Sequence, residues 1–163
     1  MNFLSRTLHF IRSVLRAREG VSDSKHSKFE ITEVQAKKMA GAAVQGAAQI
    51  HGKELNYSPE SLALVDEIVL KLREDGHTLS TINNTVVAFG CYVGEVFVRN
   101  LGFSWEMPGE EERAAGFEYL GIRNSQRLFS NPIGKVSKLL ANGAEDSVVF
   151  LYQVAAERAS KVS

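Results

Sequence analysis

The sequence lacks the cysteines and the surplus of one charge on which several classes of protein depend. Its 163 residues include a single cysteine, which excludes an intramolecular disulfide and any zinc or iron–sulfur site built from several cysteines. The 19 Lys and Arg residues balance the 19 Asp and Glu residues, so the formal net charge is +0. Proteins that bind nucleic acid need clustered positive charge to neutralise phosphates. The composition therefore argues against a nucleic-acid partner.

Long apolar segments and known catalytic motifs are also missing. The most apolar segment, Thr85 to Val98, has 14 residues, whereas a membrane-spanning helix needs about 18 or more. The histidines are widely scattered, and no phosphate-binding loop or nucleophile elbow is present. We therefore interpret the apolar segment as a buried core element and expect neither a metal nor a cofactor. An enzymatic function has no motif to support it.

Residues 1–18 have the pattern of a basic amphipathic helix. Apolar side chains, among them Phe3 and Phe10, recur at helical spacing, while arginines such as Arg12 occupy the other faces. Such a helix can lie on an anionic membrane surface, dock in a groove of a partner protein, resemble a transit peptide, or pack on its own domain.

A polar segment from Gly20 to Lys28, rich in serine and lysine, has the composition of a linker. It divides the chain into a basic helix with its linker, residues 1–28, and a single globular domain, residues 29–163. We expect an α+β domain in which a helical layer packs on a small three-stranded antiparallel sheet.

The expected elements follow from periodicity and turn residues. Ser58 and Pro59 form a typical helix start, and Gly102 is a typical helix end. The expected helices run from Glu30 to His51, from Ser58 to Asp75, from about Thr78 to Asn100, from Asn131 to Leu140, and onward from Glu145 or Asp146. The expected strands are Phe103 to Met107, Phe117 to Arg123 and Arg127 to Ser130, with Glu110 to Arg113 as an acidic loop after the first strand.

Glu95 stands out because it is the only charged residue in the most apolar segment. A carboxylate in such a place is either paired or has a raised pKa, and both situations occur at active sites. The structural interpretation is that Glu95 pairs with Arg99 or Arg123 and fixes helix against sheet. The functional interpretation is a cleft around Glu95, Tyr92 and Arg99.

Other residues in this region have similar alternatives. Gly90 and Gly94 lie on one helix face, where small residues more often allow close packing than recognition. The lone Cys91 in an apolar helix is typical of an inert core thiol.

Trp105 and the acidic residues that follow it form a second candidate site. Trp105 is either packed into the sheet or exposed as an anchor for a partner. Glu110, Glu111 and Glu112 form either a solvated loop or a surface for a basic partner.

From Tyr57 to Tyr152 the sequence resembles a family of small bacterial proteins without an assigned activity. The resemblance is carried by Trp105 and by the segments Tyr57–Leu62, Phe89–Val96, Asn131–Val136 and Asn142–Ser147. It implies a bacterial cytoplasmic protein but brings no reaction and no cofactor.

We therefore expect a non-enzymatic protein-binding module, such as an adaptor or an immunity-type inhibitor. The alternatives are a small enzyme or ligand-binding domain with a cleft around Glu95, and a protein attached to a membrane surface through residues 1–18.

Overall fold

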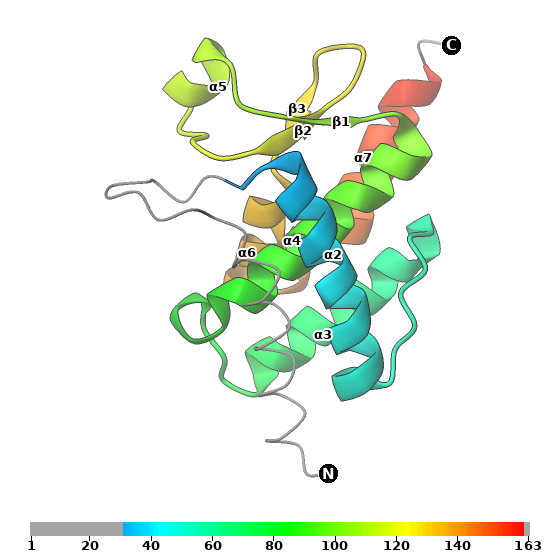
Figure 1. Cartoon of the computed structure of the whole chain (residues 1–163), viewed down its shortest axis with the longest axis vertical. Coiled ribbons are helices and arrows are strands. Elements are labelled where there is room, and N and C mark those ends of the chain that lie inside the picture. The colour runs from blue at the N-terminus through cyan, green and yellow to red at the C-terminus, as the bar shows by residue number, and fades with distance from the viewer. Residues whose placement is uncertain (1–30, 162–163) are drawn as a thin grey trace.

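The computed structural model describes residues 31–161, which form an α+β fold as the sequence predicts. Six α-helices and a three-stranded antiparallel sheet lie within this range (Figure 1). A π-helical turn follows the first of these helices, and 3-10 turns precede α3 and α7. In chain order the elements are α2 (Glu33–Gly46), the π-helical turn Ala47–His51, the 3-10 turn Pro59–Ser61, α3 (Leu62–Glu74), α4 (Leu79–Leu101), β1 (Ser104–Glu106), α5 (Glu110–Ala114), β2 (Gly121–Arg123), β3 (Phe129–Ser130), α6 (Pro132–Asn142), the 3-10 turn Ala144–Asp146 and α7 (Val148–Ser160).

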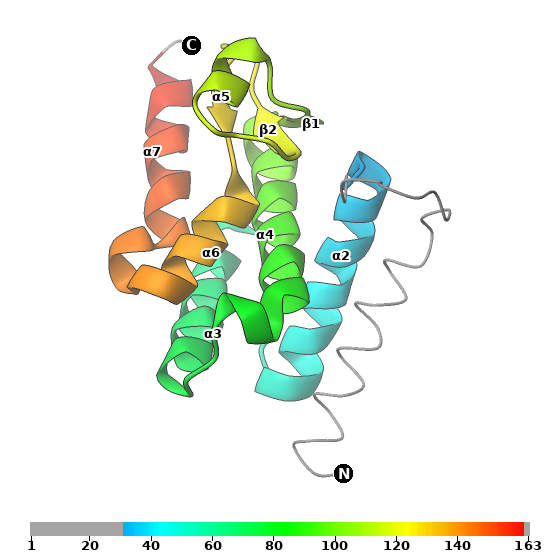
Figure 2. The same ribbon diagram turned by 90° about the vertical axis from the view of Figure 1, so that its left-hand side faces the viewer.

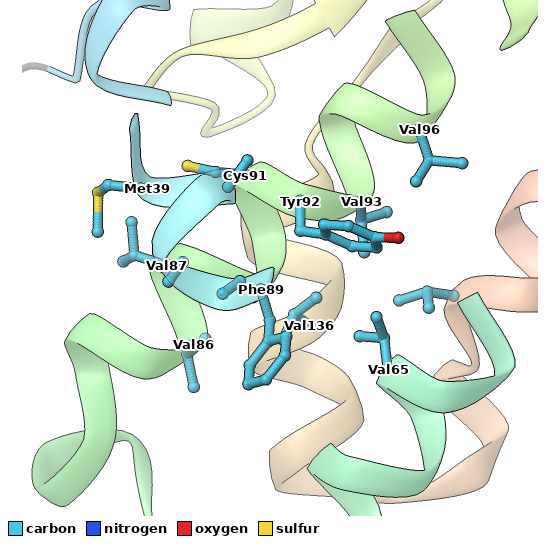
Figure 3. Packing of buried hydrophobic residues seen from close by; sticks show 14 of the residues in the cluster. Met39, Val65, Val86, Val87, Phe89, Cys91, Tyr92, Val93, Val96 and Val136 are labelled. Atoms are coloured by element: carbon cyan, nitrogen blue, oxygen red, sulfur yellow. The ribbon is translucent and has the colours of Figure 1, made fainter. Parts of the chain in front are cut away.

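The long helix α4 is the centre of the fold. Figure 2 shows α2 on one side of it and α6 on the other, and these two helices make its most extensive contacts. Every residue of α4 from Val86 to Phe97 is buried, as the apolar run predicts. Figure 3 shows Cys91 and Val87 on the side that faces Met39 of α2, and Phe89 beside Val136 of α6.

Two glycines bring neighbouring elements against the backbone of α4. A Cβ atom at Gly90 would lie 2.9 Å from Ile133 Cγ1, and one at Gly94 would overlap the indole ring of Trp105. The predicted role of these glycines in close packing is confirmed. Their absent side chains let α6 and β1 approach α4 more closely than any other residue would permit.

Local signals set the helix ends. The side chain of Ser58 accepts a hydrogen bond from the backbone of Ser61, and Pro59 occupies the first position of the turn that leads into α3. Gly102 adopts the left-handed conformation and ends α4. Both expectations are confirmed. The backbone of Ile82 departs from helical geometry, which puts a kink after the first turn of α4.

The sheet is a meander of very short strands in the order β1-β2-β3. Trp105 lies opposite Ile122, which lies opposite Ser130 on the other side. In both whole-molecule views the sheet sits at the end of the molecule away from α3 (Figures 1 and 2). The predicted meander is confirmed, although each strand is shorter than expected.

Two sequence-based expectations about α2 and α5 are wrong. The helix expected from Glu30 begins at Glu33, because Thr32 caps it in a reciprocal pair with Gln35. The expected acidic loop is helix α5, because the carboxylate of Glu112 turns back to accept a hydrogen bond from the backbone of Gly109.

Candidate functional site

The buried carboxylate of Glu95 connects α4 to the sheet. Glu95 is 3% exposed. Its Oε1 accepts a hydrogen bond of 2.9 Å from the indole Nε1 of Trp105, and its Oε2 lies 3.4 Å from Nε of Arg99. The predicted pair with Arg99 is present, and the bond to Trp105 joins helix and sheet. Arg123, the other expected partner, instead binds Glu106 and Glu112.

Arg99 extends this group of contacts to the segment before α3. Its guanidinium lies 3.5 Å from the centroid of the Tyr57 ring, a cation–π contact. Tyr57 has a φ of 63°, which is uncommon outside glycine. The backbone N–H of Tyr57 donates to the hydroxyl of Tyr92, and its carbonyl accepts from the side chain of Asn100. These bonds hold Tyr57 in that conformation against α4.

Tyr92 completes the network on the α3 side. Its hydroxyl shares a hydrogen bond of 2.6 Å with the side chain of Ser61, and its ring lies 4.9 Å from that of Tyr57. Burial raises the pKa of Tyr92. A chain of contacts therefore runs from Ser61 through Tyr92, Tyr57 and Arg99 to Glu95.

The reactive groups of this network are enclosed. Both oxygens of Glu95 are occupied, and Tyr92 is fully buried. Cys91 is fully buried as well, and burial raises the pKa of its thiol, so the reactive thiolate is disfavoured. The charged group of this network that reaches solvent is Arg99, whose side chain is 50% exposed. This geometry favours the structural interpretation of Glu95.

Trp105 belongs to the core rather than to a binding surface. It is 7% exposed, its indole nitrogen is bonded to Glu95, and its ring covers Gly94. The hypothesis of an exposed tryptophan anchor is therefore wrong, because the missing side chain at Gly94 opens a space that the ring fills.

The segment between β1 and β2, residues 107–119, contains α5 and is called the acidic lobe below. Arg123 fixes its base: one guanidinium nitrogen donates to Glu112 at 2.8 Å, and another donates to Glu106 at 3.0 Å. The bond from Arg123 holds the pKa of Glu112 below its usual value. Glu110 and Glu111 are exposed, and neither forms an ion pair within residues 31–161.

Three large apolar side chains of the acidic lobe are partly exposed, although the ring of Phe117 also packs edge-on against Phe129. Met107 is 39% exposed, Phe117 36% and Tyr119 51%. They were not predicted as a surface, because Phe117 and Tyr119 were expected in the second strand, which begins only at Gly121. The available signal was the position of Phe117 and Tyr119 a few residues after the run of glutamates at 110–112.

Phe3, Phe10 and Arg12 lie outside the described residues, as do the predicted amphipathic helix and linker of residues 1–28. The structure therefore leaves the expected membrane or partner contact of that segment a prediction. None of the helices between residues 31 and 161 is long and apolar enough to cross a membrane. Over the same range, no three His, Cys, Asp or Glu side chains are grouped in a way that could hold a metal ion.

No family model, curated protein or solved structure matches this chain. The family resemblance therefore stays a hypothesis.

Proposed function

We propose that the chain is a non-enzymatic protein-binding module, an adaptor or an immunity-type inhibitor, and that the acidic lobe is its contact surface. The observation that carries this proposal is the exposure of Met107, Phe117 and Tyr119 on the same short segment as the exposed carboxylates of Glu110 and Glu111. Aromatic and methionine side chains are enriched at protein interfaces. Surface carboxylates steer the approach of a positively charged partner.

The charges and apolar side chains of the acidic lobe indicate what kind of partner surface it would bind. Arg123 pairs with Glu106 and Glu112, whereas Glu110 and Glu111 are exposed and form no ion pair within residues 31–161, so we assign these two carboxylates to partner binding. We expect a partner whose apolar side chain covers the exposed aromatic residues and whose lysines or arginines meet these carboxylates. The proposed contact surface keeps the glutamates that the sequence predicted. In place of Trp105 it has the exposed side chains of Met107, Phe117 and Tyr119.

The alternatives have less support. An enzyme or ligand-binding cleft around Glu95 requires a carboxylate that a substrate can reach, whereas Glu95 is buried and both of its oxygens are occupied. The bacterial and cytoplasmic setting implied by the family resemblance is part of the same proposal. Residues 1–18 remain a second candidate contact, for a partner or for a membrane surface.

The proposal is tested by capture of partners from a lysate of the native host with matched variants of the full chain. The double variant Glu110→Lys/Glu111→Lys and the single variant Tyr119→Ser alter the acidic lobe. The controls are Glu145→Lys and Phe150→Ser, which change an exposed glutamate and an exposed aromatic residue outside the lobe.

We expect both lobe variants to lose a partner that the wild type and both controls retain. A partner that survives both lobe variants, or an empty capture with the wild type, contradicts the proposal. A partner that is lost only when residues 1–20 are deleted moves the contact to the N-terminal segment.

A further inference from the structure

A small apolar cavity lies between the C-terminal half of α4, the strand β3 and α7. Its volume is about 160 Å³. Its walls are mainly aromatic and aliphatic: Phe97, Phe103, Leu128, Phe129, Leu151 and Val154. Figure 2 shows α7 beside the sheet at this end of the molecule. Neither the polar network around Glu95 nor the exposed residues of the acidic lobe line this cavity.

The opening of the cavity is positively charged. Arg158 of α7 lines both the cavity and an adjoining shallow hollow, whose other walls include Arg127 and Lys161. All three cationic side chains are exposed. None of them forms an ion pair with an acidic side chain of residues 31–161. An anion at this opening would therefore meet unneutralised charge.

The loop that carries Arg127 is held in place by its own hydrogen bonds. The side chain of Asn124 accepts from the backbone N–H groups of Gln126 and Leu128, and a guanidinium nitrogen of Arg123 donates to the carbonyl of Arg127. Arg127 has a φ of 63°, which these bonds maintain. The backbone of this loop is therefore fixed before any ligand arrives, which lowers the ordering cost of binding on this side of the opening.

We propose that this cavity binds a small anion with an apolar body, in which a carboxylate or phosphate head meets Arg158 and its cationic neighbours. An engineered apolar cavity of about 150 Å³ takes one benzene ring, so the body fits one ring or a short alkyl chain. A guanidinium binds either anionic head through paired, charge-assisted hydrogen bonds. The chain's own residues 1–18 are a poor occupant, because their arginines have the same sign of charge as the rim.

The test is an NMR titration of the full chain that follows backbone amide signals with four probes. The first is 3-phenylpropionate, which has both the ring and the carboxylate. 3-Phenylpropanamide is the uncharged analogue with the same ring, and acetate has the carboxylate without the ring. Phenyl phosphate carries the other anionic head and shows which head the rim prefers. We expect 3-phenylpropionate to shift signals of residues around Leu128 and Val154, and the amide to bind about tenfold more weakly.

Two variants locate the site. Arg158→Met keeps an unbranched apolar stem and removes the charge. It should weaken 3-phenylpropionate binding about tenfold with no change in amide binding. Lys138→Met, which removes an exposed charge from α6 outside the cavity, should change neither. The inference is overturned if 3-phenylpropionate causes no shifts at millimolar concentration, if the amide or acetate binds as well, or if Arg158→Met has no effect.

Discussion

Along α4, Gly94 lets Trp105 lie against the helix backbone, and both carboxylate oxygens of Glu95 are occupied. Along the acidic lobe, Glu110 and Glu111 are exposed and form no ion pair within residues 31–161. The same residue type therefore has two uses in one chain. The carboxylate of Glu95 is committed to the fold, whereas Glu110 and Glu111 on the lobe are the ones we propose for a partner. A change at α4 should alter stability, and a change on the lobe surface should alter binding.

Gly94→Ala should have the largest effect on stability. In an isolated helix the change from glycine to alanine stabilises by about 1 kcal/mol. Here the added methyl group would overlap ring atoms of Trp105 and lie 3.2 Å from Pro132 Cγ. We expect the free energy of unfolding, measured by urea denaturation, to fall by about 3 kcal/mol.

Gly41→Ala on α2 is the matched control for this prediction. A Cβ atom at Gly41 would have no neighbour within 4 Å. This variant should therefore gain up to about 1 kcal/mol. If both substitutions change the free energy of unfolding equally, Gly94 is not needed for close packing against Trp105.

Removing the carboxylate of Glu95 should have the next largest effect. Glu95→Ala leaves the buried indole N–H of Trp105 without an acceptor and should cost about 2 kcal/mol in the free energy of unfolding. Glu95→Gln keeps an oxygen that can accept this hydrogen bond and loses only the charge that faces Arg99. We expect it to cost about 1 kcal/mol, because Arg99 is half exposed.

These two variants also distinguish the roles proposed for Glu95. If urea denaturation gives Glu95→Ala a lower free energy of unfolding than Glu95→Gln, the result supports the structural connection between α4 and β1. If the free energy of unfolding changes by less than about 0.5 kcal/mol in both variants, the structural role of Glu95 is contradicted and the functional cleft is favoured.

The smallest effect concerns acid stability at the base of the lobe. Arg123 holds the pKa of Glu112 below its usual value, so the folded state binds fewer protons there than the unfolded state. The stability from this bond is fully present above about pH 4.5 and is lost as the pH falls below that value. Thermal melting between pH 6 and pH 3 should therefore show a shallower pH dependence for Glu112→Gln than for the wild type.

Glu111→Gln is the control on the same helix. Glu111 is exposed and forms no ion pair within the described part of the chain, so its variant should follow the wild-type curve. If Glu112→Gln also follows that curve, the bond to Arg123 adds nothing to stability.

The sequence was sufficient for features that depend on neighbouring residues. Ser58 and Gly102 act at the ends of single helices, and the pair of Glu95 and Arg99 depends on a separation of one helical turn. The meander was predictable because its strands follow one another along the chain. The run from Thr85 to Val98 was predictable as core because it has almost no polar side that could face water.

Features that depend on distant residues were not predictable. Helix α5 begins where one carboxylate oxygen of Glu112 accepts a hydrogen bond from the backbone of Gly109. The other oxygen of Glu112 accepts a hydrogen bond from Arg123 of β2, a residue that is distant in the sequence. Trp105 is buried because Gly94, on another element, leaves room for it. The apolar cavity brings together residues of α4, β3 and α7, and no local pattern indicates such a meeting.

The hydrogen bond between Trp105 and Glu95 also gives the protein an internal optical reporter. Trp105 is the only tryptophan of the chain, and it sits where β1 docks on α4. Its fluorescence therefore comes from a single known junction. Loss of the docked state would expose the indole to water and shift its emission to longer wavelength. Detachment of the sheet from the helices can thus be followed without any label, separately from the circular dichroism of the helices themselves.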